Sequence, residues 1–200
     1  ENFRSSYDKN NNDVYWTNKN YCISYSELTQ QFTGFYSYEN IPAMFNVNDS
    51  FYSIGTGTTL WKQWAGDYNY FYNTFRPYNI TFIDNNMEPY DKIWNNLNFR
   101  FDAYSGTTYA YDKCFDTLEV WNEYQKGIME LKYTPNNISS LKKRFKVWRT
   151  IMPRANTLWN GIAPNGFDRI RSPWIYLKLS SNKEDNLRSE FYDLMINYFS

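Results

Sequence analysis

The sequence predicts an all-β fold, namely a β-sandwich of jelly-roll type with long loops and one or two short helices. Several segments alternate apolar and polar residues, as half-buried strands do. Clusters of Asn, Asp, Gly and Pro separate these segments and indicate turns. Aromatic residues make up 22% of the chain, a surplus that suits thick sheets and protein contacts, although an AT-rich genome would produce it as well.

The chain of 200 residues is long enough to form one domain with its own core. Residues 1–13, ENFRSSYDKNNND, are polar and are expected to form a flexible N-terminal arm. Residues 14–200 are expected to form the jelly-roll domain. We find no signal peptide and no apolar run long enough to span a bilayer, so no membrane partner is expected.

The first third of the chain is predicted to hold one strand and a long connection. Residues 14–28 are predicted as a half-buried strand, because Tyr21, Ile23 and Tyr25 fall on one face. Residues 29–60 are rich in turn formers, and we expect a long structured loop there.

The middle of the chain is predicted to continue with strands. Residues 60–72 are expected to begin with a helical turn and to continue as an aromatic block. A strand is predicted over 78–84, directly after Pro77, which cannot donate to a sheet. Residues 95–114 alternate on both sides of a Ser-Gly pair, which indicates a hairpin.

The last third mixes one predicted helix with strands. Residues 115–135 form the best helix candidate, although Gly127 weakens it. Residues 140–153 alternate cleanly and are predicted as one strand, and 173–181 as a shorter one. Residues 187–200 fit both a helix and a strand, and the β-rich context favours the strand.

The side chains that carry most enzymatic chemistry are scarce. The chain has no His, so histidine-based catalysis and most zinc sites are excluded. Its two cysteines, Cys22 and Cys114, are expected to be free thiols rather than a disulfide. Two acidic clusters lie where turns or a helix start are expected, and we assign them solvated or capping roles. They are Asp84, Glu88 and Asp91, and Asp112, Asp116 and Glu119. We therefore expect no enzyme, no cofactor and no bound metal.

A basic segment is the strongest candidate for a binding site. Cations neutralise phosphates, and rings stack on exposed bases, so this segment is a candidate nucleic-acid surface. The alternative is a solvated sheet face with Phe145, Val147 and Ile151 in the core. The candidate nucleic-acid-binding residues are Lys142, Lys143, Arg144, Lys146, Trp148, Arg149 and Arg154.

The order of these segments resembles the single-jelly-roll capsid proteins of circovirus-like viruses, which are small Rep-encoding viruses with circular single-stranded DNA. YFYNTFRPYNITFID is similar to that family's aromatic block and following strand, and KKRFKVWRTIMP to its basic aromatic strand ending in Pro. NTLWNG and SPWIYLKLSS occupy the place of its Trp-bearing loop, and EFYDLMINYFS that of its last strand. The composition suits an AT-rich member, such as one related to the redondoviruses.

The resemblance implies a virion protein that self-assembles with identical subunits into an icosahedral shell around viral single-stranded DNA. The family usually begins with an Arg-rich arm, whereas residues 1–13 contain only Arg4 and Lys9. Either such an arm precedes Glu1, or genome binding rests on residues 142–154. A carbohydrate-binding β-sandwich module, with exposed Tyr and Trp stacking on sugars, is the alternative function.

Overall fold

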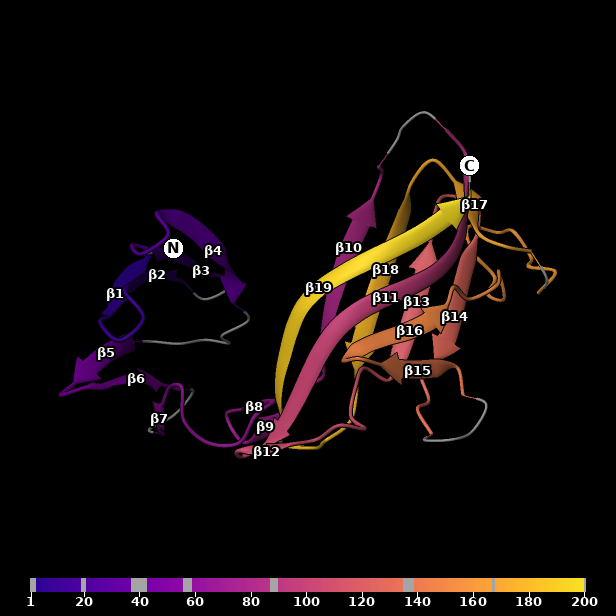
Figure 1. Ribbon diagram of the computed structural model, residues 1–200. Helices are drawn as coiled ribbons and strands as arrows, with labels where there is room; N and C mark the ends of the chain where they lie inside the picture. The colour runs from indigo at the N-terminus through magenta and orange to yellow at the C-terminus, as the bar shows by residue number, and fades with distance from the viewer. Residues whose placement is uncertain are drawn as a thin grey trace. The chain divides into compact units, whose positions relative to one another are not determined.

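The computed structural model describes residues 3–18, 21–36, 43–55, 59–86, 90–134, 139–166 and 168–199. The chain divides into two compact units, residues 1–66 and residues 67–200 (Figure 1). This division differs from the expected flexible arm and single domain, because the first 66 residues pair their strands with one another.

The first unit consists of two small antiparallel sheets. One has the strand order β1-β2-β3-β4 and the other β5-β6-β7. The buried Tyr15 of the first sheet stacks on Phe51 of the second, with ring centroids 5.6 Å apart. The strands are β1 (Arg4–Asp8), β2 (Asp13–Thr17), β3 (Cys22–Ser26), β4 (Gln31–Tyr36), β5 (Ala43–Val47), β6 (Ser50–Ile54) and β7 (Leu60–Lys62).

The polar segment predicted as a flexible arm forms strand β1 and the turn that follows it. Asp8 is fully buried there, and its carboxylate accepts hydrogen bonds from Asn10 N, Asn11 Nδ2 and Trp64 Nε1. A buried carboxylate with three donors fixes a turn that composition alone marks as loose. The expected loop over 29–60 likewise holds β4, β5 and β6, and the expected helical turn after it starts as strand β7.

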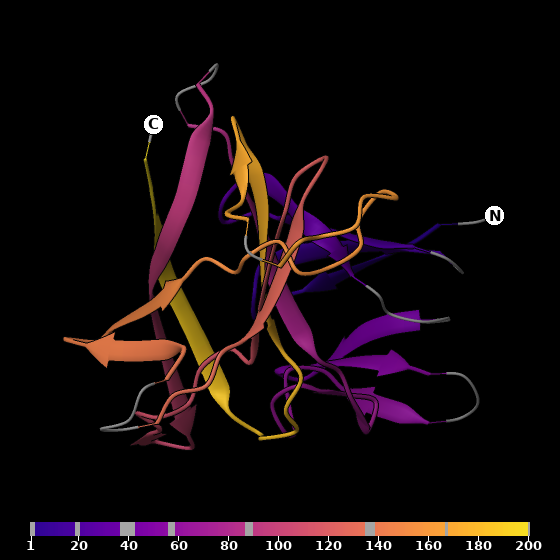
Figure 2. The ribbon, with the colours of Figure 1, turned by 90° about the vertical axis from the view of Figure 1, so that its right-hand side faces the viewer.

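The second unit is a β-sandwich. One sheet has the order β10-β18-β13-β14, and the other has β12-β11-β16-β15, with β17 and β19 also paired to β11. Figure 2 shows β11 and β19 in one layer and β10, β13 and β18 in the other. The strands are β8 (Tyr70–Phe71), β9 (Thr74–Phe75), β10 (Tyr78–Asp84), β11 (Lys92–Ser105), β12 (Thr108–Tyr109), β13 (Thr117–Trp121), β14 (Lys126–Glu130), β15 (Leu141–Arg144), β16 (Val147–Ile151), β17 (Arg171–Ser172), β18 (Ile175–Ser181) and β19 (Arg188–Phe199).

The core of the second unit lies between its two sheets. Leu118 and Val120 of β13 and Leu177 of β18 are fully buried on one side. Phe99 of β11 and Trp148 of β16 face them from the other sheet. Each of these residues alternates with outward-pointing neighbours, which is the period of two that a sandwich requires.

The helix predicted over 115–135 is wrong, because most of this segment is the β13–β14 hairpin. Asn122 Oδ1 accepts hydrogen bonds from the backbone N–H groups of Tyr124 and Gln125 and closes the turn. Gly127 is required by a close backbone approach, since a Cβ there would lie 2.4 Å from the carbonyl oxygen of Arg154. Leu118, Trp121, Ile128 and Leu131 are spaced as on one side of a helix, but in the strand Leu118 and Val120 are the residues that alternate into the core.

The all-β class is confirmed, and so are several individual strands. The predicted strands over 78–84, 173–181 and 187–200 correspond to β10, β18 and β19, and the predicted hairpin over 95–114 to β11 and β12. The one or two short helices are absent from the residues that the structure describes. That part of the chain also contains no helix long and apolar enough to span a membrane.

Candidate nucleic-acid interface

The basic segment is a β-hairpin and not the single strand that its alternation predicts. Strands β15 and β16 pair in register, with Lys142 opposite Arg149 and Lys143 opposite Trp148. Phe145 and Lys146 form the two-residue connection with φ angles of 50° and 63°. Two left-handed residues in succession are the signature of a type I′ turn, which Asn-Gly usually forms. Phe-Lys carries no such signal, and the turn was therefore missed.

Trp148 belongs to the core and not to the exposed surface, so it cannot stack on a nucleic-acid base. Its side chain is fully buried, and Nε1 donates to the carbonyl oxygen of Phe101 at 2.9 Å. The alternative face is wrong as well, since Phe145 is 85% exposed and Ile151 65%. If residues 140–153 formed one strand, every second residue would face the same side. The turn breaks this alternation, so odd-numbered residues face inward in β15 and even-numbered residues face inward in β16.

Lys143 is held beneath the hairpin by aromatic and polar partners. Its Nζ lies 4.2 Å from the centroid of the Trp148 ring and donates to Tyr109 Oη at 2.6 Å and to the Tyr111 carbonyl at 2.8 Å. Tyr109 in turn donates to Asp102 Oδ1 at 2.9 Å. Burial lowers the pKa of Lys143, while burial and the bond to Asp102 raise the pKa of Tyr109 to about 12. Lys143 is therefore an anchor of the hairpin and is not free for a ligand.

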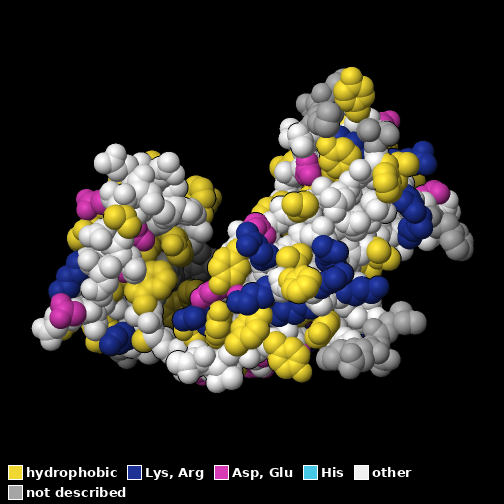
Figure 3. All heavy atoms as spheres, in the orientation of Figure 1, with side chains coloured by type: hydrophobic (Ala, Val, Ile, Leu, Met, Phe, Trp, Pro, Cys, Tyr) yellow, Lys and Arg dark blue, Asp and Glu magenta, His cyan; other side chains and the backbone are white. Residues whose placement is uncertain are grey.

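The remaining predicted cations point outward. We call Lys142, Arg144, Lys146 and Arg149 the cation face, because all four are exposed. Figure 3 shows Lys and Arg side chains gathered over β15, β16 and the adjoining part of β11. Arg154 is also exposed and is joined by an antiparallel bridge to Arg169 beyond the end of β16. The structure thus separates five exposed cations from Lys143 and Trp148, which support them.

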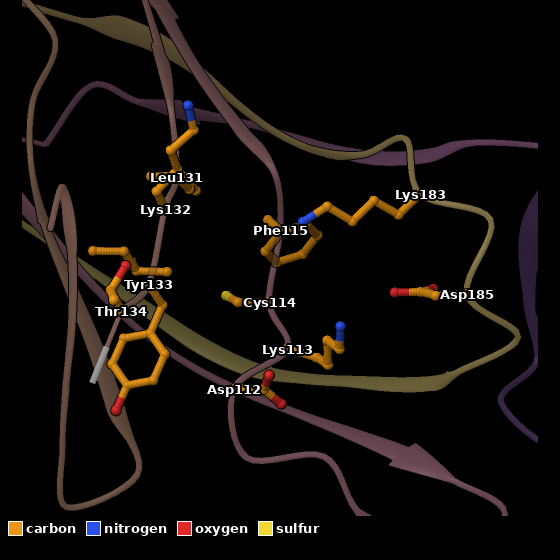
Figure 4. A pocket seen from close by; sticks show the side chains of 11 residues that line it. Asp112, Lys113, Cys114, Phe115, Leu131, Lys132, Tyr133, Thr134, Lys183 and Asp185 are labelled. Atoms are coloured by element: carbon orange, nitrogen blue, oxygen red, sulfur yellow. The ribbon is translucent and has the colours of Figure 1, made fainter.

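A pocket of about 290 Å³ lies elsewhere in the second unit and holds the second cysteine. Figure 4 shows Cys114 near its centre, with Tyr133 on one side and Asp185 on the other. Burial raises the pKa of the Cys114 thiol, which keeps it protonated and a poor nucleophile. Lys183 at the pocket rim pairs with Asp116 at 2.5 Å. The Cys114 thiol is therefore not an activated nucleophile.

Three residues of the two acidic clusters, Asp84, Asp116 and Glu119, have structural partners. Asp84 Oδ1 accepts a hydrogen bond from Asn86 N. Asp116 Oδ2 accepts a hydrogen bond from Asn182 N, and Glu119 pairs with Lys126 and Lys178. Glu88 lies outside the described residues. Among the residues described, no group of three His, Cys, Asp or Glu is placed to hold a metal ion. Both cysteines are free, as expected. The lack of an enzymatic activity and of a cofactor stays a prediction.

Comparison with known proteins decides the family. A family model described as "Crassvirus muzzle protein" matches residues 1–57, and one described as "Crassvirus muzzle protein C-terminal domain" matches residues 66–155. Together the two models match most of the chain. The muzzle protein of Bacteroides phage crAss001 is 49% identical over 199 residues, which cover 100% of this chain. The chain belongs to the Crassvirus muzzle protein family. It spans 14% of the length of that relative.

The muzzle family overturns the resemblance to circovirus-like capsid proteins. An icosahedral shell around single-stranded DNA is therefore wrong, and the carbohydrate-binding alternative gains no support. The expected localisation in the virion is confirmed, because a Crassvirus muzzle protein is a structural component of the virus particle. The resemblance depended on the order and spacing of segments and on no specific motif, whereas the family is established by identity along the whole chain.

Proposed function

We propose that this chain is a non-enzymatic structural segment of a muzzle protein that joins copies of the protein in the virion through its first unit. The proposal rests on one observation, an exposed apolar surface on the sheet β1-β2-β3-β4. We call Val14, Trp16, Ile23, Tyr25, Phe32 and Phe35 the aromatic face. They lie on one side of neighbouring strands, with Trp16 paired to Ile23 and Ile23 to Phe35.

The aromatic face is left open, although its rings pack on one another. Phe32 is 64% exposed and Phe35 is 78% exposed. Phe32 lies 5.3 Å from Tyr25 and 6.2 Å from Trp16, measured between ring centroids. Contiguous apolar patches of this kind mark interaction sites, and aromatic residues are enriched at the centres of such interfaces.

The opposite side of the same sheet is buried, and there the apolar Tyr15 and Cys22 alternate with small polar residues. Thr17, Ser24 and Ser26 point inward there. The aromatic face carries no charged side chain, so an identical face on a second copy is complementary to it. A symmetric contact between copies buries the same patch twice and is the commonest arrangement in soluble oligomers.

Sedimentation velocity of the 200-residue chain over a concentration series tests the proposal. We expect reversible association in the micromolar range, which Phe32→Ser with Phe35→Ser abolishes. Leu28→Ser is the matched control, because Leu28 is 79% exposed but lies in the turn after β3. A wild-type chain that stays monomeric at every concentration, or an equal loss with Leu28→Ser, would refute the proposal.

A further inference from the structure

The cation face places like charges directly opposite one another without a counter-charge. Lys142 faces Arg149 across the hairpin, at the separation of about 5 Å between opposed Cβ atoms. The next residue in that row is the neutral Asn98 of β11. Among the described residues, no carboxylate forms an ion pair with any of the four cations. Arg100, one row further along, is already paired with Asp193.

The other sheet of the same unit shows how this protein treats outward lysines elsewhere. On that sheet, Lys126 and Lys178 both pair with Glu119, at 3.0 and 3.6 Å. Surfaces that serve only solubility mix the two signs of charge in this way. The formal net charge of the chain is zero, so the positive charge of the cation face is a local concentration.

The tip of the hairpin retains two residues in a conformation that glycine and asparagine adopt more easily. Phe145 and Lys146 both have positive φ, and Phe145 is 85% exposed. The Arg144 guanidinium lies 5.2 Å from the centroid of the Phe145 ring. Strained, exposed residues persist where a surface has a use for their side chains. Here the two strained residues are Lys146, which supplies one cation, and Phe145, whose ring contacts the guanidinium of Arg144.

The cation face is rigid because its support is buried. Trp148 and Lys143 fix the inner side of the hairpin through the bond to Phe101 and the contacts with Tyr109. A surface ordered before binding loses less entropy when it meets a ligand.

We propose that the cation face binds the phosphate backbone of duplex DNA without reading its sequence. Duplex DNA carries one charge per about 1.7 Å of its axis, so every cation on the face has a phosphate within reach. Guanidinium groups such as those of Arg144 and Arg149 bind phosphate with two parallel hydrogen bonds. The Arg144 guanidinium lies over one side of the exposed Phe145 ring at the hairpin tip. Stacking of successive unpaired bases uses a row of rings rather than one, and this favours a duplex over a single strand. Crassvirus has a double-stranded DNA genome.

Fluorescence anisotropy with a labelled duplex of about 20 base pairs, at several salt concentrations, tests this inference. Four phosphate contacts predict a slope of about −3.6 for log K against log salt, and a loss of affinity of about 150-fold between 50 and 200 mM. Lys142→Gln with Arg149→Gln should reduce the slope to about −1.8 and the loss to about tenfold. Lys146→Gln, at the exposed hairpin tip, should lower the slope by about 0.9 even if the double variant is poorly folded.

The control is Arg4→Gln with Lys62→Gln, which removes the same charge from exposed positions in the first unit. It should leave the slope unchanged. An equal change in the control, or the absence of salt-dependent binding at 50 mM, would overturn the proposal. Binding of polyglutamate as tight as that of duplex DNA would assign the face to an acidic protein, and tighter binding of a single strand would assign it to exposed bases. Either result contradicts the proposal and leaves the association test untouched, because that test changes only the first unit.

Discussion

The aromatic face of the first unit and the cation face of the second are both outer faces of antiparallel sheets, yet their chemistry is opposite. In the first unit, small polar residues such as Ser24 are buried, and Phe35 is left in solvent. In the second, Trp148 is buried and Arg149 is left in solvent. The second unit buries its large apolar side chains between its two sheets, whereas the first unit leaves Phe32 and Phe35 exposed, and the proposed contact between copies would cover them.

Removal of one tryptophan from a sheet of each unit gives the largest expected difference between the two units. Trp148→Ala should lower the free energy of unfolding by about 3–5 kcal/mol, because it empties a core site and leaves the Phe101 carbonyl without its donor. Trp16→Ala, on the half-buried aromatic face, should cost less than half as much. Urea denaturation of both variants measures this, and equal losses would show that the two tryptophans contribute equally despite their different burial.

Relief of strain at the hairpin tip should strengthen the second unit while weakening its cation face. Phe145→Asn with Lys146→Gly supplies the residues that a type I′ turn prefers and should raise the free energy of unfolding by about 1 kcal/mol. DNA binding should become weaker because one cation is lost. Phe145→Ala is the control, since it removes the ring and keeps the strain. If the double variant is less stable than the wild type, the two residues are not strained.

The ion pairs of Glu119 with Lys126 and Lys178 should make the free energy of unfolding depend on pH in the acidic range. Burial raises the pKa of Glu119, but the hydrogen bond from Lys126 and the charges of Lys126 and Lys178 outweigh it and hold the pKa below its ordinary value. A pKa lowered by folding contributes stability above the unfolded value of about 4.3, and this stability is lost as the pH falls through the folded value.

Glu119→Gln should therefore cost about 1 kcal/mol or less at pH 7, and its stability should converge with that of the wild type in acid. Thermal melting between pH 7 and pH 3 follows this convergence. A gap of constant size over that range would mean that the charge of Glu119 contributes nothing.

The smallest expected effect concerns the opposed cations themselves. Lys142→Gln removes the repulsion with Arg149 and should stabilise the chain by a few tenths of a kcal/mol at low salt. The gain should vanish at about 1 M salt, where screening acts over roughly 3 Å. Lys62→Gln in the first unit should give no gain at any salt concentration. If Lys142→Gln is instead less stable than the wild type, Lys142 is stabilised by a negative charge and not repelled by Arg149, which would contradict this prediction.

Strands with clear alternation could be predicted from the sequence. Strands whose turns depend on contacts with distant residues could not. Ile80 and Phe82 alternate inward along β10, and the β-rich context placed β19 correctly. The β13–β14 hairpin was missed because its turn depends on hydrogen bonds to Asn122, and because Gly127 is needed for an approach to Arg154. The aromatic face was missed because Phe32 and Phe35 lie in a segment whose turn formers suggested a loop. The spacing of these two residues around Gly34 was the available signal.

The sequence by itself determined that the chain is all β, that it lacks histidine chemistry and that positive charge concentrates near residues 142–149. Only the tertiary structure decided that Phe145 and Lys146 form a turn, and that Trp148 faces inward and Arg149 outward. Alternation along a strand is local and can be read from neighbouring residues. Which of the two faces is buried depends on the sheet packed against it, and that sheet is built from residues distant in the sequence.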